Sequence, residues 1–250
     1  MATWNGAKFL PEQLETLIPQ LTFGDEVVVV DDGSSDETLE ILKRAANESK
    51  AAVIRIHQNE RRLGPMSTFE RALSLARGDI LLLCDQDDRW LPGKADRMRS
   101  LFAGDPDLTL VISDAQVIDG TGRIIAPSWR ALSPFWRSWL ATMVKNKYHG
   151  CTMAFRQTSM EYCLPIPAGA PHHDQWIGIL HSIFGKVLYI PEPLIQYRRH
   201  GGNNQTGRRA PWLQMLRWRY DLAINFAARC WCVSRSMRDQ RRTLGPPASS

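Results

Sequence analysis

Residues 26–36 read EVVVVDDGSSD, so four consecutive valines lead directly into two aspartates and a glycine-serine turn. A continuous β-branched run bounded by turn residues is typical of a strand buried on both faces of a parallel sheet. Carboxylates that follow such a strand lie at the carboxyl edge of the sheet, where open α/β sheets bind their ligands. The stretch therefore predicts an α/β fold with a polar ligand site after this strand.

The same pattern recurs at residues 80–88, which read ILLLCDQDD. An aliphatic run again ends in clustered carboxylates. Carboxylates this close repel one another, so a cation or a hydrogen-bonded ligand usually stabilises them. Together the two stretches indicate a site for a nucleotide and a divalent metal ion.

Helical and strand-like patterns alternate through the first part of the chain. Apolar residues with helical spacing occur around 10–21, 37–48, 65–77 and 92–104, and short strand-like runs occur at 53–57 and 108–113. This alternation favours a doubly wound, mostly parallel nucleotide-binding half over residues 1–115. We expect residues 116–207 to form the acceptor-binding and catalytic half of the same domain. Within it, the tryptophan-rich residues 128–148 suit a loop or lid near a ligand.

The composition is that of a globular protein, with 44% hydrophobic residues. No run reaches the roughly 18–20 uncharged apolar residues that span a bilayer, and the N-terminus lacks the pattern of a signal peptide. The five cysteines are an odd number and lack metal-finger spacing. We therefore expect reduced thiols and a cytoplasmic location.

Residues 208–250 form a basic, aromatic tail, which we expect to be helical. They hold nine arginines and two aspartates but no lysine or glutamate, a net charge of +7 in a chain whose total is +5. Arginines mixed with tryptophans suit a helix that lies on the inner face of an anionic membrane. Plain packing on the body is the alternative. RNA binding is disfavoured, because no nucleic-acid module accompanies the tail.

Five short motifs follow one another along the chain: Thr3-Trp4-Asn5-Gly6, Val30–Asp36, Asp85–Trp90, His173–Trp176 and Tyr197–Asn204. Together they resemble the family 2 glycosyltransferases with the GT-A fold, and within them the rhamnosyltransferase-like group. The resemblance extends from residue 1 to about residue 207. It implies an inverting transferase that moves a sugar from dTDP-rhamnose or a UDP-sugar to a glycan or lipid-linked acceptor in cell-envelope polysaccharide synthesis.

By this resemblance, the first acidic motif binds the base and ribose of the donor. Asp32 matches that role, because a carboxylate can accept from an imide N–H or from ribose hydroxyls. Thr3 and Asn5 match an element whose backbone lies beside the base. The residues alone leave open a helix-capping turn at Asp32 and Asp36, since aspartate favours such turns whatever binds there.

Asp85 and Asp87 match the D-x-D element of the family. The resemblance implies that Asp87 binds Mg²⁺ or Mn²⁺, while Asp85 contacts ribose or a metal-bound water. His200 and Arg198 match a loop that closes over the diphosphate, with the imidazole as a metal ligand and the guanidinium on phosphate. A solvated acidic turn and a basic surface loop are the alternatives.

Two further residues are candidates. Lys94 suits a phosphate or sugar contact. Asp174 matches the position of the family's catalytic base, which takes the proton from the acceptor hydroxyl as it attacks the anomeric carbon. Asp174 could also cap the helix that follows, and the two roles are compatible.

One feature departs from the family. A full strand normally precedes the Thr-x-Asn-Gly element, but here only Met1-Ala2-Thr3 corresponds to it. Loss of a central strand would cost several kcal/mol of a total stability of about 5–15 kcal/mol. We therefore expect a truncated first strand, with the true start upstream, or a non-catalytic relative that has lost donor binding.

Two other classes of protein share part of the pattern. A receiver-type signalling domain also places acidic residues after two strands, but it does not need the residues after 110. A nucleotidyltransferase would need a glycine-rich triphosphate loop near the start of the chain. Both are weaker interpretations than a glycosyltransferase.

Overall fold

The valine run of residues 27–30 lies in strand β2 (Glu26–Asp31) of the computed structural model, which describes residues 1–133, 142–143, 146–201 and 212–243. The chain divides into two compact units. One comprises Met1–Ile166 with His172–Arg208, and the other comprises Pro167–Pro171 with Arg209–Ser250. The predicted acidic motifs all lie in the first unit.

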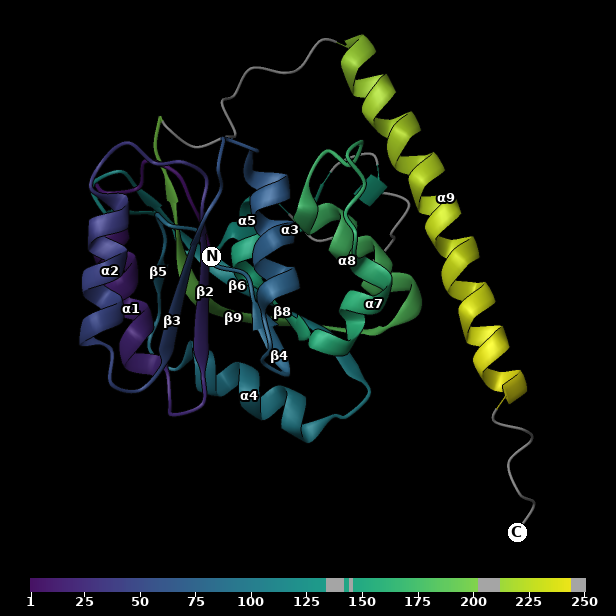
Figure 1. Cartoon of the computed structure of the whole chain (residues 1–250), viewed down its shortest axis with the longest axis horizontal. Coiled ribbons are helices and arrows are strands. Elements are labelled where there is room, and N and C mark those ends of the chain that lie inside the picture. The colour runs from purple at the N-terminus through teal and green to yellow at the C-terminus, as the bar shows by residue number, and fades with distance from the viewer. Residues whose placement is uncertain (134–141, 144–145, 202–211, 244–250) are drawn as a thin grey trace. The chain divides into compact units, whose positions relative to one another are not determined.

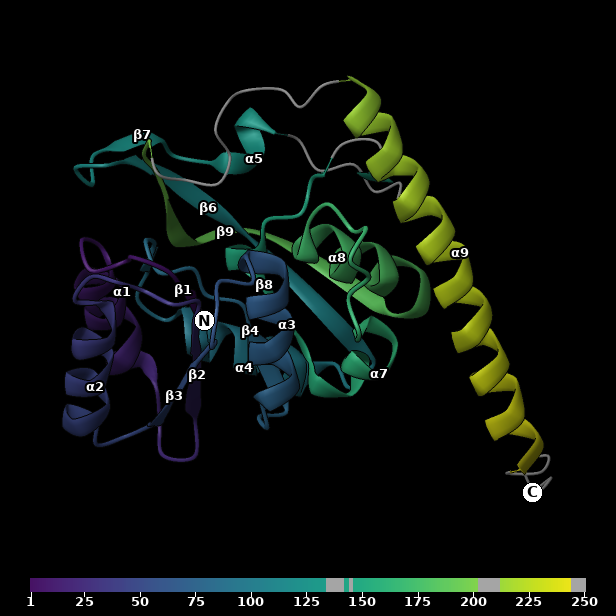
Figure 2. The same ribbon diagram turned by 45° about the horizontal axis from the view of Figure 1, so that its top comes forward.

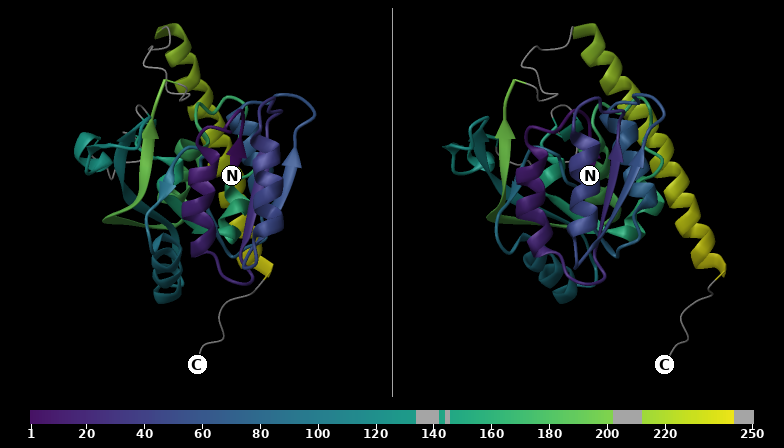
Figure 3. Two further views of the ribbon diagram at one scale, coloured as in Figure 1. Left: turned by 90° about the vertical axis from the view of Figure 1, so that its left-hand side faces the viewer. Right: turned by 60° about the vertical axis from the view of Figure 1, so that its left-hand side comes forward.

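Strand β2 is the middle strand of a parallel three-stranded sheet, between β1 (Ala2–Thr3) and β3 (Val53–Gln58). All four valines are buried. Val27 and Val29 pack with apolar residues of α1 (Leu10–Leu17) and α2 (Thr38–Glu48). Helices α1 and α2 lie side by side in Figures 1 and 3, and α3 (Pro65–Leu75) lies against β2 from the other side. Cover on both faces explains why this strand has no polar alternation.

The second sheet has six strands. Its main path runs in the order β4 (Ile80–Leu82), β8 (Met153–Arg156), β6 (Leu108–Asp119), β9 (Lys186–Arg199) and β5 (Arg89–Trp90), and β7 (Ile124–Ala126) pairs with β6. Strands β6 and β9 are parallel and lie side by side in Figure 2, whereas β7 and β8 are antiparallel to β6. The predicted α/β fold is confirmed, and the second sheet is mixed because the chain returns through these antiparallel strands.

Helices α4 (Lys94–Gly104) and α8 (His173–Phe184) both contact β6. Met98 and Phe102 of α4 pack against Leu108 and Val111 of β6. The remaining short elements are η1 (Ile18–Gln20), α5 (Trp129–Leu132), η2 (Gly150–Thr152), η3 (Gln157–Ser159) and α7 (Met160–Cys163).

The short first strand is present but has only two residues. Ala2 pairs with Val30, and the amino group of Met1 donates to the carbonyl oxygen of Val28 at 2.7 Å. Burial lowers the pKa of this ammonium, although nearby Cys84 and Asp85 oppose the shift. Beside Met1 lies a cavity of about 350 Å³, lined by residues 26–28 of β2, residues 80–82 of β4 and apolar side chains of α1 and α3. This cavity therefore lies between β2 of the first sheet and β4 of the second sheet.

Two expected boundaries are wrong. The strand expected at 108–113 continues to Asp119, because the buried residues Ala115, Val117 and Ile118 prolong it. Tyr197 and Arg198 were expected in a loop, but they belong to β9 and pair with Val117 and Ile118 of β6. The loop therefore begins only at residue 200. Of the motif's last residues, 202–204 lie outside the described part.

The expected lid at 128–148 is described only in part. Helix α5 is a single turn whose first residue is Trp129, and the hydroxyl of Ser128 accepts a hydrogen bond from the backbone N–H of Ala131. Trp136 and Trp139 lie outside the described residues.

The second unit contains α9 (Trp212–Thr243), a helix of 32 residues. Residues 208–211 and 244–250 of the predicted tail lie outside the described residues. Among the helices that the structure describes, none combines the length and apolar character needed to cross a bilayer.

Candidate functional site

The first and third sequence motifs meet at the carboxyl ends of β1 and β4. The side-chain amide of Gln86 pairs with the backbone of Trp4: the Trp4 N–H donates to Gln86 Oε1 at 2.8 Å, and Gln86 Nε2 donates to the Trp4 carbonyl at 3.0 Å. Gly6 lies directly beside this amide, where a Cβ atom would overlap Gln86 Oε1. The sequence analysis did not single out Gln86, although it lies inside a predicted motif.

The first aspartate of the valine-aspartate motif is bound by its own loop. The carboxylate of Asp31 is buried and accepts hydrogen bonds from the Thr3 hydroxyl at 2.9 Å and from the Ser34 N–H at 2.8 Å. The Gly33 N–H donates to the same carboxylate, and Gly33 has a positive φ of 80°, which glycine adopts without strain. Thr3, which was expected to contact a donor, is thus buried and connects β1 to β2.

The second aspartate also has partners within the chain. Asp32 accepts hydrogen bonds from Asn59 Nδ2 at 2.8 Å, the Leu63 N–H at 2.7 Å and the Gly64 N–H at 2.8 Å. Burial disfavours its charged form, but these hydrogen bonds outweigh burial and lower the pKa of Asp32. In this structure Asp32 organises the loop between β3 and α3. For Asp32 to contact ribose as predicted, its carboxylate has to accept a ribose hydroxyl in addition to these donors or in place of one of them.

Asn5 connects the first two motifs. Its N–H donates to the Ser34 hydroxyl at 2.9 Å, and its side-chain oxygen accepts from the Ser35 N–H at 2.9 Å. Asp36 bridges in the same way, because it accepts from the N–H groups of Ala7 and Thr38. The N-cap of α2 is Glu37, so Asp36 is not the cap that was predicted, although it accepts from the N–H of Thr38, the first residue of the helix.

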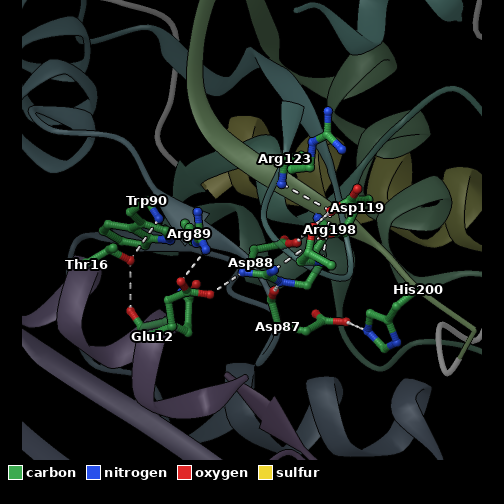
Figure 4. A network of polar contacts seen from close by, with 12 residues as sticks. Glu12, Thr16, Asp87, Asp88, Arg89, Trp90, Asp119, Arg123, Arg198 and His200 are labelled. Atoms are coloured by element: carbon green, nitrogen blue, oxygen red, sulfur yellow. Dashed lines mark hydrogen bonds and ion pairs between the residues drawn. The ribbon is translucent and has the colours of Figure 1, made fainter. Parts of the chain in front are cut away.

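The third motif brings several carboxylates together. Asp87 Oδ2 lies 2.8 Å from His200 Nε2, and Figure 4 shows the two side chains pointing toward one another. Burial, together with the nearby carboxylates of Asp87 and Asp174, raises the pKa of Asp85 to about 7. The structure thus places the predicted metal residues beside each other and brings Asp174 near enough to influence Asp85.

Asp88 is the most enclosed carboxylate of the cluster. Its Oδ1 accepts from the Arg198 N–H at 2.9 Å, and the buried thiol of Cys151 also interacts with the carboxylate. Burial, with Asp87 and Asp85 nearby, raises the pKa of Asp88 well above its ordinary value. One potential ligand atom from each of Asp85, Asp88 and Cys151 lies within 4.8 Å of the others. Surplus negative charge in a buried cluster is what a bound cation would relieve.

Arg198 was predicted to contact phosphate, but it is 1% exposed. Its Nε donates to the Asp87 carbonyl at 2.8 Å, and its guanidinium forms an ion pair with Glu12, as drawn in Figure 4. Glu12 also pairs with Arg89. The direct phosphate contact is therefore not what the structure shows: Arg198 supports the backbone of the D-x-D element from β9.

Lys94 is also displaced from its predicted role. Its side chain is fully buried, and Nζ donates to the Cys151 carbonyl at 2.7 Å. Burial lowers the pKa of Lys94, and the surrounding Cys151, Cys84, Asp88 and Asp85 oppose the shift. The lysine lies beneath the acidic cluster, where its charge acts on the carboxylates.

Asp174 lies in the first turn of α8 and is largely buried. Asn146 Nδ2 donates to Oδ1 at 2.9 Å and the Gly150 N–H donates to Oδ2 at 3.2 Å, while the Gln175 N–H donates to Oδ1 at 2.7 Å. The helix N-cap is His172, so Asp174 is not the cap that the alternative interpretation assigned. Three donors from two segments hold the carboxylate in one orientation.

An aromatic group lies near Asp174. The rings of Trp129 and His149 stack at 4.4 Å between centroids, and Tyr197 meets His149 edge-on at 4.5 Å. Burial lowers the pKa of His149, and the charge of Asp174 opposes that shift. Trp129 and Tyr197 carried a signal in the sequence, through the tryptophan-rich segment and the fifth motif, whereas His149 carried none.

Residues 1–162 match the family model described as Glycosyl transferase family 2. The uncharacterized protein Rv1520 of Mycobacterium tuberculosis is 29% identical over 206 residues, which are 79% of this chain and 57% of that protein. An uncharacterized glycosyltransferase of Nostoc sp. is 24% identical over 211 residues, which are 82% of this chain and 65% of that protein. The chain thus spans about 57–65% of the length of these relatives.

Solved structures show the same fold. TarS residues 1–349 of Staphylococcus aureus, in complex with UDP-GlcNAc, superpose with a TM-score of 0.64 at 18% identity, covering 84% of this chain and 60% of that one. Glucosyl-3-phosphoglycerate synthase of M. tuberculosis, in complex with Mn²⁺, UDP and glucosyl-3-phosphoglycerate, gives a TM-score of 0.57 at 17% identity, covering 92% and 77%. The predicted GT-A fold is confirmed by these likenesses.

Proposed function

Because the chain belongs to glycosyl transferase family 2, we propose that it transfers a sugar from a nucleoside-diphosphate donor to an acceptor hydroxyl, with inversion at the anomeric carbon. Two observations carry this proposal: the 2.8 Å contact of Asp87 with His200, and the influence of the Asp174 carboxylate on Asp85. They support a metal-binding group with a candidate base near it, as displacement at a sugar carbon requires.

The donor we propose is a UDP-sugar or dTDP-rhamnose. TarS and glucosyl-3-phosphoglycerate synthase, which share the fold, have been solved with UDP-GlcNAc and with UDP. The order of motifs, similar to the rhamnosyltransferase-like group, supports dTDP-rhamnose. Both nucleotides carry a pyrimidine with an imide N–H, which suits a carboxylate-rich loop such as residues 31–36.

Asp87 and His200 would hold Mg²⁺ or Mn²⁺, with Asp85 and Asp88 supplying further oxygen atoms nearby. Oxygen-rich sites with an imidazole suit Mn²⁺, and carboxylates with phosphate oxygens suit Mg²⁺. The burial of Asp88 and the raised pKa of Asp85 and of Asp88 fit a bound cation. Such an ion supplies Lewis-acid stabilisation of the leaving diphosphate.

The residues of the chain provide the remaining chemistry. We assign Asp174 as the base that accepts the acceptor's hydroxyl proton, while the acceptor oxygen bonds to the anomeric carbon and the bond from that carbon to the diphosphate breaks. Asn146 and the Gly150 N–H orient the carboxylate. Of Trp129, His149 and Tyr197, Trp129 alone is partly exposed, so its ring supplies an apolar face of the kind that sugars stack on.

The acceptor we propose is a glycan or a lipid-linked glycan of cell-envelope polysaccharide synthesis, reached at the cytoplasmic face of the plasma membrane. No nucleic acid is part of the proposal.

Calorimetric titration with UDP and with dTDP, each with and without Mn²⁺, tests the donor site. We compare the native chain with Asp87→Ala and with a matched control, Asp96→Ala, whose side chain on α4 is 82% exposed. The proposal expects Mn²⁺-dependent binding that only Asp87→Ala removes, and the base that binds identifies the donor class.

A second candidate is a non-catalytic relative that keeps the fold. The observation in its favour is that the carboxylates of Asp31 and Asp32 are already engaged by hydrogen bonds from the chain. Absence of nucleotide binding in a folded native chain would support this candidate and reject the transferase.

A further inference from the structure

Helix α9 carries large apolar side chains that are exposed to solvent. Tyr220 is 66% exposed, Ile224 is 50% exposed and Trp231 is 61% exposed. A helix face that meets only water normally carries polar residues, since each exposed apolar side chain forgoes the gain from burial. These three residues therefore mark a face that suits an apolar surrounding.

The three residues share one face of the helix. They are separated by intervals of four and seven residues, which place side chains above one another on an α-helix. With 3.6 residues per turn, their directions fall within about 40° of one another around the axis. Ala227, which is also exposed, lies in the same sector. We call Tyr220, Ile224 and Trp231 the aromatic stripe.

Arginines border the aromatic stripe. Arg217 is 83% exposed, with its guanidinium 3.8 Å from Asp221, and Arg235 lies over the ring of Trp231 at 5.6 Å from its centroid. Both are about 60° from Tyr220 around the axis, and the exposed Arg219 lies on the other side of the stripe. Because the tail as a whole carries nine arginines and two aspartates, the surface that complements it is anionic.

We propose that α9 lies along the surface of an anionic membrane, with the aromatic stripe inserted below the headgroups and the bordering arginines at the level of the lipid phosphates. Tryptophan and tyrosine favour this interface, and long arginine side chains reach back from it to phosphate. Each basic residue near an anionic leaflet adds to the attraction. A nucleic acid would match the arginines but would leave Ile224 in water.

This inference goes beyond the proposed function and does not depend on the donor site. The test is co-sedimentation of the full chain with vesicles of phosphatidylcholine alone and of phosphatidylcholine mixed equally with phosphatidylglycerol. We expect binding to the mixed vesicles that weakens with salt. The triple variant Tyr220→Ser, Ile224→Ser, Trp231→Ser should bind about tenfold or more weakly, and Arg217→Glu with Arg235→Glu should lose the preference for the anionic lipid.

Matched controls separate the stripe from the rest of the helix. The double variant Gln214→Ser, Ala223→Ser changes exposed positions outside the stripe and should bind as the native chain does. Circular dichroism shows whether each variant is folded. An environment-sensitive dye at Ile224→Cys, in a chain lacking Cys230 and Cys232, should shift to shorter wavelength on mixed vesicles. The same dye at native Cys232, about 120° from Tyr220 around the axis, should shift less.

Two results would overturn the inference. One is that the native chain fails to sediment with the mixed vesicles. The other is that the folded triple variant sediments as strongly as the native chain. Nucleotide binding, measured on both the native chain and the triple variant, keeps either result distinct from a failure of the proposed transferase function.

Discussion

His200 Nε2 lies 2.8 Å from Asp87 Oδ2, although 113 residues separate the two in the chain. The contact exists because β9 ends at Arg199, which is paired with the last residue of β6, and so delivers residue 200 to the D-x-D element. An imidazole and a carboxylate at this distance form a natural pair of ligands for a divalent ion.

From this contact we predict that His200→Ala weakens Mn²⁺ binding in the presence of UDP by about tenfold, because the variant loses one of the two side chains proposed to hold the metal ion. The measurement is a Mn²⁺ titration of UDP binding. His57→Ala, on β3 and outside the acidic cluster, is the control and should leave the titration unchanged. Equal Mn²⁺ affinity in His200→Ala would show that the imidazole is not a ligand.

We predict that Asp174→Asn reduces turnover by about 10²–10⁴-fold while nucleotide binding persists, because an amide cannot accept the acceptor's proton. Asn146→Ala should lower kcat more than it raises KM, since it removes the 2.9 Å hydrogen bond that orients Asp174. Turnover and calorimetric binding are measured on the same preparations. Loss of UDP binding in Asp174→Asn would instead assign this residue to the donor site.

Gly6 and Gln86 are predicted to act as a unit. A Cβ atom at residue 6 would displace the Gln86 amide, which otherwise pairs with the Trp4 backbone through hydrogen bonds of 2.8 and 3.0 Å. Gly6→Ala and Gln86→Leu should each weaken nucleotide binding several-fold. The double variant should bind nucleotide no more weakly than the weaker single variant, because both changes remove the same contact between Gln86 and Trp4. If the losses of binding free energy in the two single variants instead add up in the double variant, the two residues are not coupled.

Asp32 should make stability depend on pH. Its folded-state pKa is lowered from the ordinary value of 3.8, so the unfolded chain binds the proton more readily. The ionised carboxylate of Asp32 contributes fully to folding stability above about pH 3.8. This contribution is lost as the pH falls through the lower pKa of the folded state. Asp32→Asn should therefore be less stable than the native chain by about 1–3 kcal/mol near neutral pH, and the difference should shrink in acid. Urea unfolding at several pH values measures the difference in stability between the two proteins. A difference that does not change with pH would contradict the lowered folded-state pKa of Asp32.

The strands and the placement of the acidic motifs could be predicted from the sequence. The valine run becomes β2, and residues 31–36 and 85–88 follow strand ends as expected. These features depend on local periodicity and turn chemistry, which a single segment contains. The base candidate Asp174 was likewise expected near the start of a helix, and it lies in the first turn of α8.

The roles of Lys94 and Arg198 could not be predicted in the same way. A lysine at the start of a helix and an arginine beside a glycine-rich segment suggest solvent-facing cations. The structure buries both, because Lys94 meets the carbonyl of Cys151 and Arg198 meets Glu12 and the Asp87 carbonyl. Their partners are distant in sequence, so no local pattern reveals them.

By itself, therefore, the sequence determined that carboxylates gather at the carboxyl ends of buried strands, since apolar runs and turn residues encode strand ends locally. Only the tertiary structure decided which polar groups face one another and which are enclosed. The Arg198 N–H that binds Asp88 is 110 residues away, and the imidazole beside Asp87 is 113 residues away. Burial and hydrogen-bond partners of this kind arise when sheets assemble from distant segments, which is why they are properties of the fold and not of any one motif.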